Sequence, residues 1–515
     1  MEEFITRHSD EIVGVLEGWD RVLFRGTLTG VSYVKGMMRF LWHKRVLLKD
    51  FMEFGKRLTA ELTECAQRTA ASAGREYRYL SSAQESKDQL AEALAARDRV
   101  REGLVCVLAC VEPCMSYEVR ADRGARKLLL EYTHRKCRFF YFYFLHPQFG
   151  LMHVRLQSWF PFQAQVCING RSYLERRLIK AGMGYRKRDN CFVAVSDVKK
   201  AQAMLDDLIA LDWRAALNRI VGPLNPLIRR GGALRDLGGY YWTIRQSEYA
   251  TDVMFKDEQT LAQAYPHLIR HAVEKLGCED VLRFLGQKLN GNFRKEVTSA
   301  RARRPEGVRV KHRVGANSIK MYDKQGSVLR VETTINDPGV YRVWRPPQTN
   351  PAAAPAWQAM RKAVADISRR AEVSRAANHR YLRAMSVVED PTPAHRVLDP
   401  VSRSRRRGER SYRGLRPVSV DDAQLFTAVL AGEHVLNGFA NGDIRARLFR
   451  GPPRDDAERN RRIAKVGRQL RLLREHGLIQ KVNKQRLYRV TPNGQRIMAL
   501  ALTMRGANSN RLLAA

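Results

Sequence analysis

The last hundred residues carry the pattern that most restricts how this chain can fold. Apolar residues recur there at intervals of three and four, at Ile463, Val466, Leu470 and Leu473. That spacing predicts a helix with one buried face, which ends before Gly477. The expected elements are helices at 421–431, 439–449 and 456–476, strands at 478–482 and 487–491, and a helix after Pro492. Three helices, a hairpin and a fourth helix can enclose one small core.

Basic residues surround the apolar stripe of the third expected helix. They are Arg459, Arg461, Arg462, Lys465, Arg468, Arg471 and Arg474. A helix with one buried seam and one guanidinium-rich face suits the major groove of DNA. The strings LLREHGLI at 472–479 and YRVTPNG at 488–494 resemble the winged-helix domains of MarR-like regulators over about 80 residues. The resemblance implies DNA binding, with Lys484 and Arg486 on a basic wing, although winged helices also mediate protein contacts.

The overall charge points to a polyanionic partner. The chain of 515 residues has 91 Lys and Arg against 53 Asp and Glu, a net charge of +38, and +16 of it lies in 401–515. Such an excess repels itself unless a polyanion compensates, and nucleic acid is the usual one. DNA is favoured and RNA stays open. The arginine-rich run 403–416, with Arg405, Arg406 and Arg407, predicts a solvated tether that clamps phosphates.

Several classes of protein are not expected. No apolar run is long enough to span a bilayer, and no secretory signal opens the chain, so a cytoplasmic protein without a membrane partner is predicted. The eight cysteines form no C-x-x-C pair, which favours buried free thiols over zinc or disulfides. The oligomeric state stays open.

The predicted fold class is α+β and multidomain, with mixed α/β N-terminal and central blocks before a C-terminal winged helix. No internal repeat is visible in the sequence. The predicted divisions are a helical and α/β region at 1–125, a β-rich α/β domain at 126–225, a central α/β domain at 226–345, a linker rich in proline and arginine at 346–418 that contains a helix at 357–385, and the winged helix at 419–505.

A candidate active site falls in the central domain. Strand alternation over 318–323 places Lys320 and Tyr322 on one face, where the tyrosine suits attack on phosphorus. The acidic candidates for holding Mg²⁺ or Mn²⁺ are Glu332 on the next strand and Glu248 and Asp252 upstream, and His312 supplies an imidazole. A metal-dependent nuclease of another fold, which would add Asp323 to these acids, stays open.

The strings SIKMYDK at 318–324 and LRVE at 329–332 resemble core strands of rolling-circle replication initiators of plasmids and filamentous phages. The resemblance covers 25 to 30 residues and implies a metal-dependent DNA-nicking endonuclease. The chain departs from that family because it lacks the His-hydrophobic-His metal pair. A packed strand tyrosine and a cross-strand ion pair of Arg330 with Glu332 are the structural alternatives.

Three functional hypotheses follow. The first is a mobile-element or replication protein that binds DNA through the winged helix and nicks or processes a strand. The second is a non-catalytic regulator or ribonucleoprotein component that binds DNA or structured RNA. The third is an interaction protein with an acidic partner. The strings FRGTL at 24–28 and VEPC at 111–114 are also similar to a group of uncharacterised bacterial proteins, which implies a bacterial cytoplasmic origin and says nothing about activity.

Overall fold

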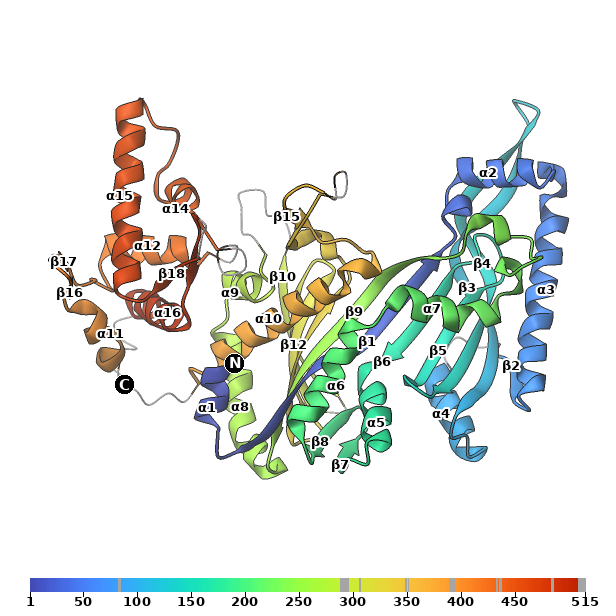
Figure 1. Cartoon of the computed structure of the whole chain (residues 1–515), viewed down its shortest axis with the longest axis horizontal. Helices are drawn as coiled ribbons and strands as arrows, with labels where there is room; N and C mark the ends of the chain where they lie inside the picture. Colours follow the sequence, from blue (N-terminus) through green and yellow to red (C-terminus); the bar gives the residue numbers. More distant parts are fainter. Residues whose placement is uncertain are drawn as a thin grey trace.

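The computed structural model describes residues 1–515 apart from 82–84, 288–295, 305–306, 348–349, 351, 389–393, 432–433, 435–437, 483–485 and 508–515. It is a multidomain α+β protein, in which a large sheet with packed helices is followed by a helical C-terminal region (Figure 1). No helix of the described part is both long enough and apolar enough to cross a lipid bilayer.

One sheet of eleven strands forms the body of the molecule, in the order β10-β11-β12-β13-β9-β1-β6-β5-β4-β3-β2. Its neighbours pair antiparallel except for β2 and β3, which are parallel. The strands are β1 (Ile12–Thr27), β2 (Glu76–Tyr79), β3 (Gly103–Asp122), β4 (Lys127–His146), β5 (Gly150–Gln157), β6 (Ala164–Asn169), β9 (Tyr241–Phe255), β10 (Val297–Arg304), β11 (Gly307–Val314), β12 (Asn317–Lys324) and β13 (Val328–Ile335). The sheet therefore crosses the divisions predicted at 125/126 and 225/226.

The two halves of this sheet share one order of elements. The long strands β1 and β9 pair at the middle and run diagonally through the molecule (Figure 1). Each is followed by helices and later by a four-stranded meander whose last strand returns to pair with it, although the first half also has β2 and α4 before its meander. Strands β3 to β6 return to β1, and β10 to β13 return to β9. The repeat that the sequence conceals is thus visible in the topology.

Helices cover both faces of the sheet. On the face that carries Leu16 and Tyr143 lie α4 (Lys87–Arg97), α5 (Gly170–Lys180), α6 (Val198–Ala210) and the hairpin of β7 (Tyr185–Arg188) and β8 (Cys191–Val195). We call this the site face. The opposite face packs against α3 (Phe51–Ser72), α7 (Trp213–Val221), α8 (Glu258–Glu274), α9 (Cys278–Phe284) and α10 (Ile367–Met385). Two further helices of this part of the chain are α1 (Glu2–Arg7) and α2 (Val34–His43).

The segment predicted as a linker is partly built into the sheet. Its helix is shorter than the expected 357–385, because β15 (Ala356–Ala359) pairs instead with β14 (Arg342–Arg345) and only α10 is helical. Asn378 of α10 hydrogen-bonds both to Thr333 on β13 and to the carbonyl of Tyr249 on β9. The helix is therefore packed against the two strands and does not act as a tether.

The C-terminal region has its own core and the expected succession of helices and hairpin. Its elements are α11 (Ala394–Ser402), β16 (Arg405–Arg407), β17 (Arg410–Tyr412), α12 (Val420–Val429), α14 (Asn441–Leu448), α15 (Asp456–Glu475), β18 (Ile479–Lys481), β19 (Tyr488–Val490) and α16 (Pro492–Gly506). One member of the predicted stripe was wrong, because Ile463 is 37% exposed. Val466, Leu470 and Leu473 are buried in this core, whereas Ile463 lies toward the first turns of α15, outside it.

Candidate active site

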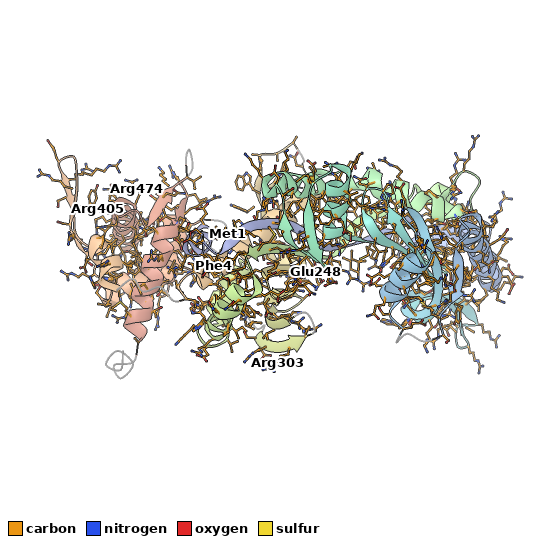
Figure 2. The ribbon with its side chains drawn as sticks, turned by 90° about the horizontal axis from the view of Figure 1, so that it is seen from below. Met1, Phe4, Glu248, Arg303, Arg405 and Arg474 are labelled. Carbon is orange, nitrogen blue, oxygen red and sulfur yellow. The ribbon has the colours of Figure 1, made fainter. Side chains whose placement is uncertain are left out.

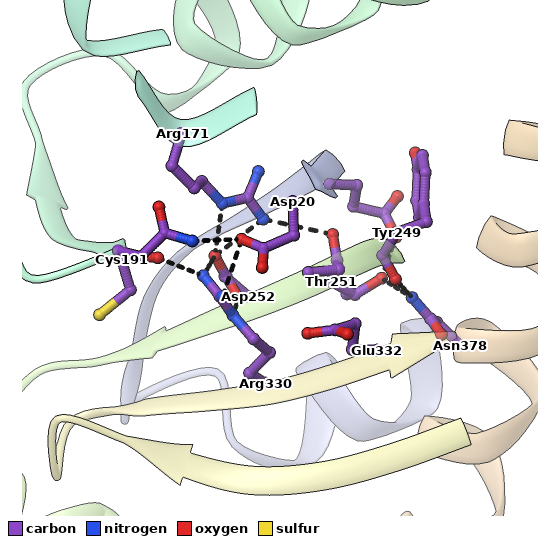
Figure 3. A network of polar contacts seen from close by, with 12 residues as sticks. Asp20, Arg171, Cys191, Tyr249, Thr251, Asp252, Arg330, Glu332 and Asn378 are labelled. Carbon is purple, nitrogen blue, oxygen red and sulfur yellow. Dashed lines mark hydrogen bonds and ion pairs between the residues drawn. The ribbon is translucent and has the colours of Figure 1, made fainter. Parts of the chain in front are cut away.

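Three carboxylates meet at the middle of the sheet, on its site face. Asp20 lies on β1, Glu248 on the neighbouring β9 and Glu332 on β13, and one oxygen of each lies within 4.8 Å of the others. We call this group the carboxylate cluster. Figure 3 shows Asp20 and Glu332 from the two sides of the site, and Figure 2 places Glu248 near the middle of the molecule.

Backbone register explains how the cluster forms. Trp19 pairs with Tyr249 and Arg21 with Glu248, so a β-bulge leaves Asp20 as an extra residue without a partner on β9. Bulges of this kind re-aim a side chain. Glu332 pairs with Ala250, and since alternate residues share a face, Glu248 points to the same side as Glu332.

A buried network of two arginines and two aspartates fixes the position of Asp20. Arg330 reaches Oδ1 of Asp20 through Nη1 at 3.0 Å and Oδ2 of Asp252 through Nη2 at 2.8 Å. Arg171, from α5, donates from Nε to the same Asp252 oxygen at 3.0 Å (Figure 3). Burial alone would raise the pKa of Asp252, but the two guanidinium groups outweigh burial and hold it below its usual value. Nε of Arg330 also donates to Oδ1 of Asp252, so both oxygens of Asp252 bind arginines. Asp252, which the sequence predicts as a metal ligand, therefore lies outside the group of three carboxylates that could share an ion.

Lys320 and Tyr322 on β12 both reach Glu332, as strand alternation predicts. Nζ of Lys320 lies 2.7 Å from Oε1 of Glu332, and the hydroxyl of Tyr322 donates to Oε2 at 3.1 Å. Tyr322 is only 6% exposed. Burial, and then the charge of Glu332, raises the pKa of Tyr322 well above its usual value. Burial likewise raises the pKa of Glu332 to about 7, against the opposing effect of Lys320.

His312 does not belong to this site, contrary to the prediction. It pairs with Ile319, whose side chain lies on the face opposite to Lys320. There His312 contacts Ser299 Oγ at 2.7 Å and the hydroxyl of Tyr381 on α10 at 3.2 Å, and burial lowers its pKa to about 4. Asp323 also points away, since it accepts a hydrogen bond from the backbone of Val308 at 2.8 Å.

Mutual repulsion of the three carboxylates favours a divalent cation at the carboxylate cluster. Burial, and then the charges of Asp20 and Glu248, raise the pKa of Glu332, and a cation bound between the three groups would remove that repulsion. The fully buried Glu332 is held on Oε1 by the ammonium of Lys320 at 2.7 Å. Three carboxylate ligands at this spacing suit Mg²⁺ or Mn²⁺.

The predicted nucleic-acid residues of α15 differ in their availability. Arg459 pairs with Asp456 at 3.2 Å, Arg462 with Glu458 at 2.6 Å, and Lys465 lies over the ring of Phe449. Arg461, Arg468 and Arg471 are exposed and form no ion pair within the described residues. These three cations, which we call the α15 arginines, are the ones left for a polyanion.

The other predicted contacts lie around the same region. Arg486 is exposed beside β19, whereas Lys484 lies outside the described residues. Arg405, Arg406 and Arg407 are exposed on a short hairpin instead of a tether, and Arg407 binds Glu475 at the end of α15 at 2.9 Å. In Figure 2, Arg405 and Arg474 stand at one end of the molecule and Glu248 near its middle.

No family model, curated protein or solved structure matches this chain, so geometry alone supports the site. Sequence reasoning found Glu248, Glu332, Lys320 and Tyr322 but missed Asp20. The available signal was a pair of acidic residues, Glu17 and Asp20, inside a largely apolar strand at 12–27, and it does not single out Asp20. The bulge that turns it toward Glu332 leaves no mark in composition.

Proposed function

We propose that this protein binds DNA through its C-terminal region and cleaves one strand at the carboxylate cluster. The observation that carries the proposal is the meeting of Asp20, Glu248 and Glu332 from three adjacent strands, in a chain of net charge +38. Carboxylates held this close are costly unless a cation joins them. In a polycationic protein they indicate chemistry on a polyanion.

Asp20, Glu248 and Glu332 would hold one Mg²⁺ or Mn²⁺. When bound, such an ion neutralises a phosphate oxygen and makes the phosphorus more open to attack. Arg330 orients Asp20 and Lys320 orients Glu332 through ion pairs. This arrangement needs no histidine ligand, which accounts for the lack of a His-hydrophobic-His pair.

Tyr322 is the proposed nucleophile. Its oxygen forms a bond to phosphorus while its proton passes to Glu332, the acceptor of its hydrogen bond. The bond from phosphorus to the leaving sugar oxygen breaks, and that oxygen takes a proton from water. The products are a tyrosyl-phosphate ester on one strand end and a free hydroxyl on the other.

The C-terminal region supplies affinity for the duplex in this proposal. Its order of helices and hairpin fits a winged helix, with α15 as the recognition helix. The α15 arginines and the exposed hairpin at Arg405–Arg407 face solvent and would lie against phosphates.

The proposal is tested by incubating the full chain with a random-sequence pool of single-stranded DNA and Mg²⁺ or Mn²⁺, then sequencing new strand ends. We expect cleavage that Glu248→Gln lowers more than about 100-fold, because it removes one charged ligand. Glu274→Gln, a carboxyl change at the exposed end of α8 and outside the cluster, serves as the matched control. Absence of cleavage with either metal would refute the proposal.

Tyr322→Phe separates two forms of the chemistry. If the tyrosine attacks, the wild-type protein leaves a covalent protein–DNA adduct on a denaturing gel, and the variant leaves none. Cleavage that survives the substitution without an adduct would assign the attack to water.

A second candidate, binding without cleavage, is favoured by one observation, the 6% exposure of Tyr322. It predicts retention of intact DNA with a steep dependence on salt and no new strand ends.

A further inference from the structure

A cavity opens on the site face directly beside the carboxylate cluster. Its volume is about 740 Å³, and Asp20 and Glu248 belong to both the cavity wall and the cluster. The floor comes from β1, β4, β5, β6 and β9, and the walls from α4, α5 and the turn between β7 and β8. We call it the side cavity.

The side cavity carries an excess of negative charge, although the chain as a whole is positively charged. Six carboxylates line it against four Lys or Arg, whereas the whole chain carries +38. Asp88 and Glu92, one turn apart on α4, are both exposed there. A wall with excess negative charge repels phosphate, so a phosphate is not the group that this space accepts.

Neutral hydrogen-bonding groups complete the wall. His153 on β5 lines the cavity, and its pKa falls to about 4 because it is buried, so its imidazole is uncharged at neutral pH. A neutral imidazole offers one donor and one acceptor. Its ring lies 5.0 Å from that of Tyr143, whose hydroxyl donates to Oδ1 of Asp88 at 2.7 Å. Carboxylate acceptors with a neutral imidazole match the edge of a nucleobase that carries an amino group.

The position of the cavity connects this chemistry to the strand. A nucleotide whose phosphate lies at Asp20 and Glu248 has its base within reach of the space that the same two residues line. A base can enter only if it leaves its stack, which is least costly in single-stranded nucleic acid.

We propose that the side cavity binds an unstacked nucleobase with an exocyclic amino group (adenine, cytosine or guanine) next to the phosphodiester that the cluster cleaves. The inference rests on the proposed function, since it places the phosphate at the cluster. It assigns base selection to Asp88, Glu92 and His153, none of which belongs to the cluster.

The test compares single-stranded decamers that have the same phosphates and different bases. Binding of dA10, dC10, dT10 and an abasic decamer to the full chain is measured by fluorescence anisotropy in Ca²⁺. We expect dA10 or dC10 to bind about 10-fold more tightly than dT10 and the abasic strand, because bidentate base contacts discriminate at this level.

A double variant, Asp88→Asn with Glu92→Gln, separates base recognition from folding. It removes two negative charges, so the abasic decamer should bind equally or more tightly while the preference for dA10 or dC10 falls at least about fivefold. Damage to the fold would weaken all decamers together. The control, Asp206→Asn with Asp207→Asn on α6, makes the same charge change outside the cavity and should keep the preference.

Three outcomes overturn the inference. Equal binding of base-bearing and abasic decamers would exclude a base site, and a preference that survives the α4 variant would place the base elsewhere. Displacement of the decamer by micromolar dAMP would assign the cavity to free nucleotides. If wild-type protein binds DNA without base preference, only this inference fails, whereas failure to bind any decamer removes the proposed function as well.

Discussion

Arg171 and Arg330 at the centre of the sheet are 0% and 1% exposed, whereas Arg461, Arg468 and Arg471 on α15 face solvent. The two central arginines share Asp252, and Arg330 also binds Asp20. The α15 arginines have no carboxylate partner within the described residues. The same side chain is thus neutralised in one region and left unneutralised in the other.

This difference separates two uses of positive charge. A buried guanidinium without a partner is very unfavourable, so the central arginines orient carboxylates and cannot be spared. An exposed guanidinium is solvated, so it contributes little to the stability of the fold and remains able to bind an anionic ligand. Replacing a central arginine should therefore lower the free energy of unfolding more than replacing an α15 arginine. Replacing the α15 arginines should instead have the larger effect on affinity for DNA.

The largest loss of stability is expected from Arg330→Met. The change leaves Asp252 and Asp20 with fewer partners inside the sheet and should lower the free energy of unfolding by about 3–5 kcal/mol. Urea denaturation followed by circular dichroism measures it, with Arg468→Met as the exposed control. A loss no greater than that of the control would break the comparison.

An intermediate effect is expected at Glu112, which binds the half-buried Arg155 through Oε2 and accepts from the hydroxyl of Tyr141 at 2.8 Å. Burial would raise the pKa of Glu112, but Tyr141 and Arg155 outweigh it and lower the pKa to about 2. Because the folded pKa is the lower one, the stabilisation is present above the unfolded pKa near 4.5 and is lost as pH falls toward 2.

Glu112→Gln should therefore cost about 1–3 kcal/mol at neutral pH and almost nothing near pH 2. Denaturation curves at a series of pH values give this difference, and the exposed Glu64→Gln is the control. A cost that stays constant over this pH range would show that packing, and not the ion pair, causes it.

The smallest change in stability is expected from joint replacement of the α15 arginines by Gln. The free energy of unfolding should move by less than about 0.5 kcal/mol, since all three are exposed. The slope of log affinity for DNA against log salt should meanwhile fall by about 2 to 3. An unchanged slope would remove α15 from the DNA interface.

The periodicity of the sequence predicts which residues within one strand or helix share a face. Alternation alone placed Lys320 and Tyr322 on one face of β12, and contacts of both with Glu332 confirm it. The same rule could not exclude His312. Alternation tells which residues of one strand share a face, but the pairing register decides which residues of the neighbouring strand lie on that same face. For Asp252 the sequence could not show the binding of its carboxylate by two arginines, since these partners lie 81 and 78 residues away along the chain.

The sequence by itself determined the mixed α+β class, the succession of elements after residue 419, and the concentration of positive charge there, because these depend on composition and on spacing of a few residues. Only the tertiary structure decided that one sheet joins the first 335 residues, that a bulge turns Asp20 toward Glu248 and Glu332, and that the side cavity opens beside them. Those features arise from strand register across more than 200 residues, and register depends on which long-range pairing buries the most side chains.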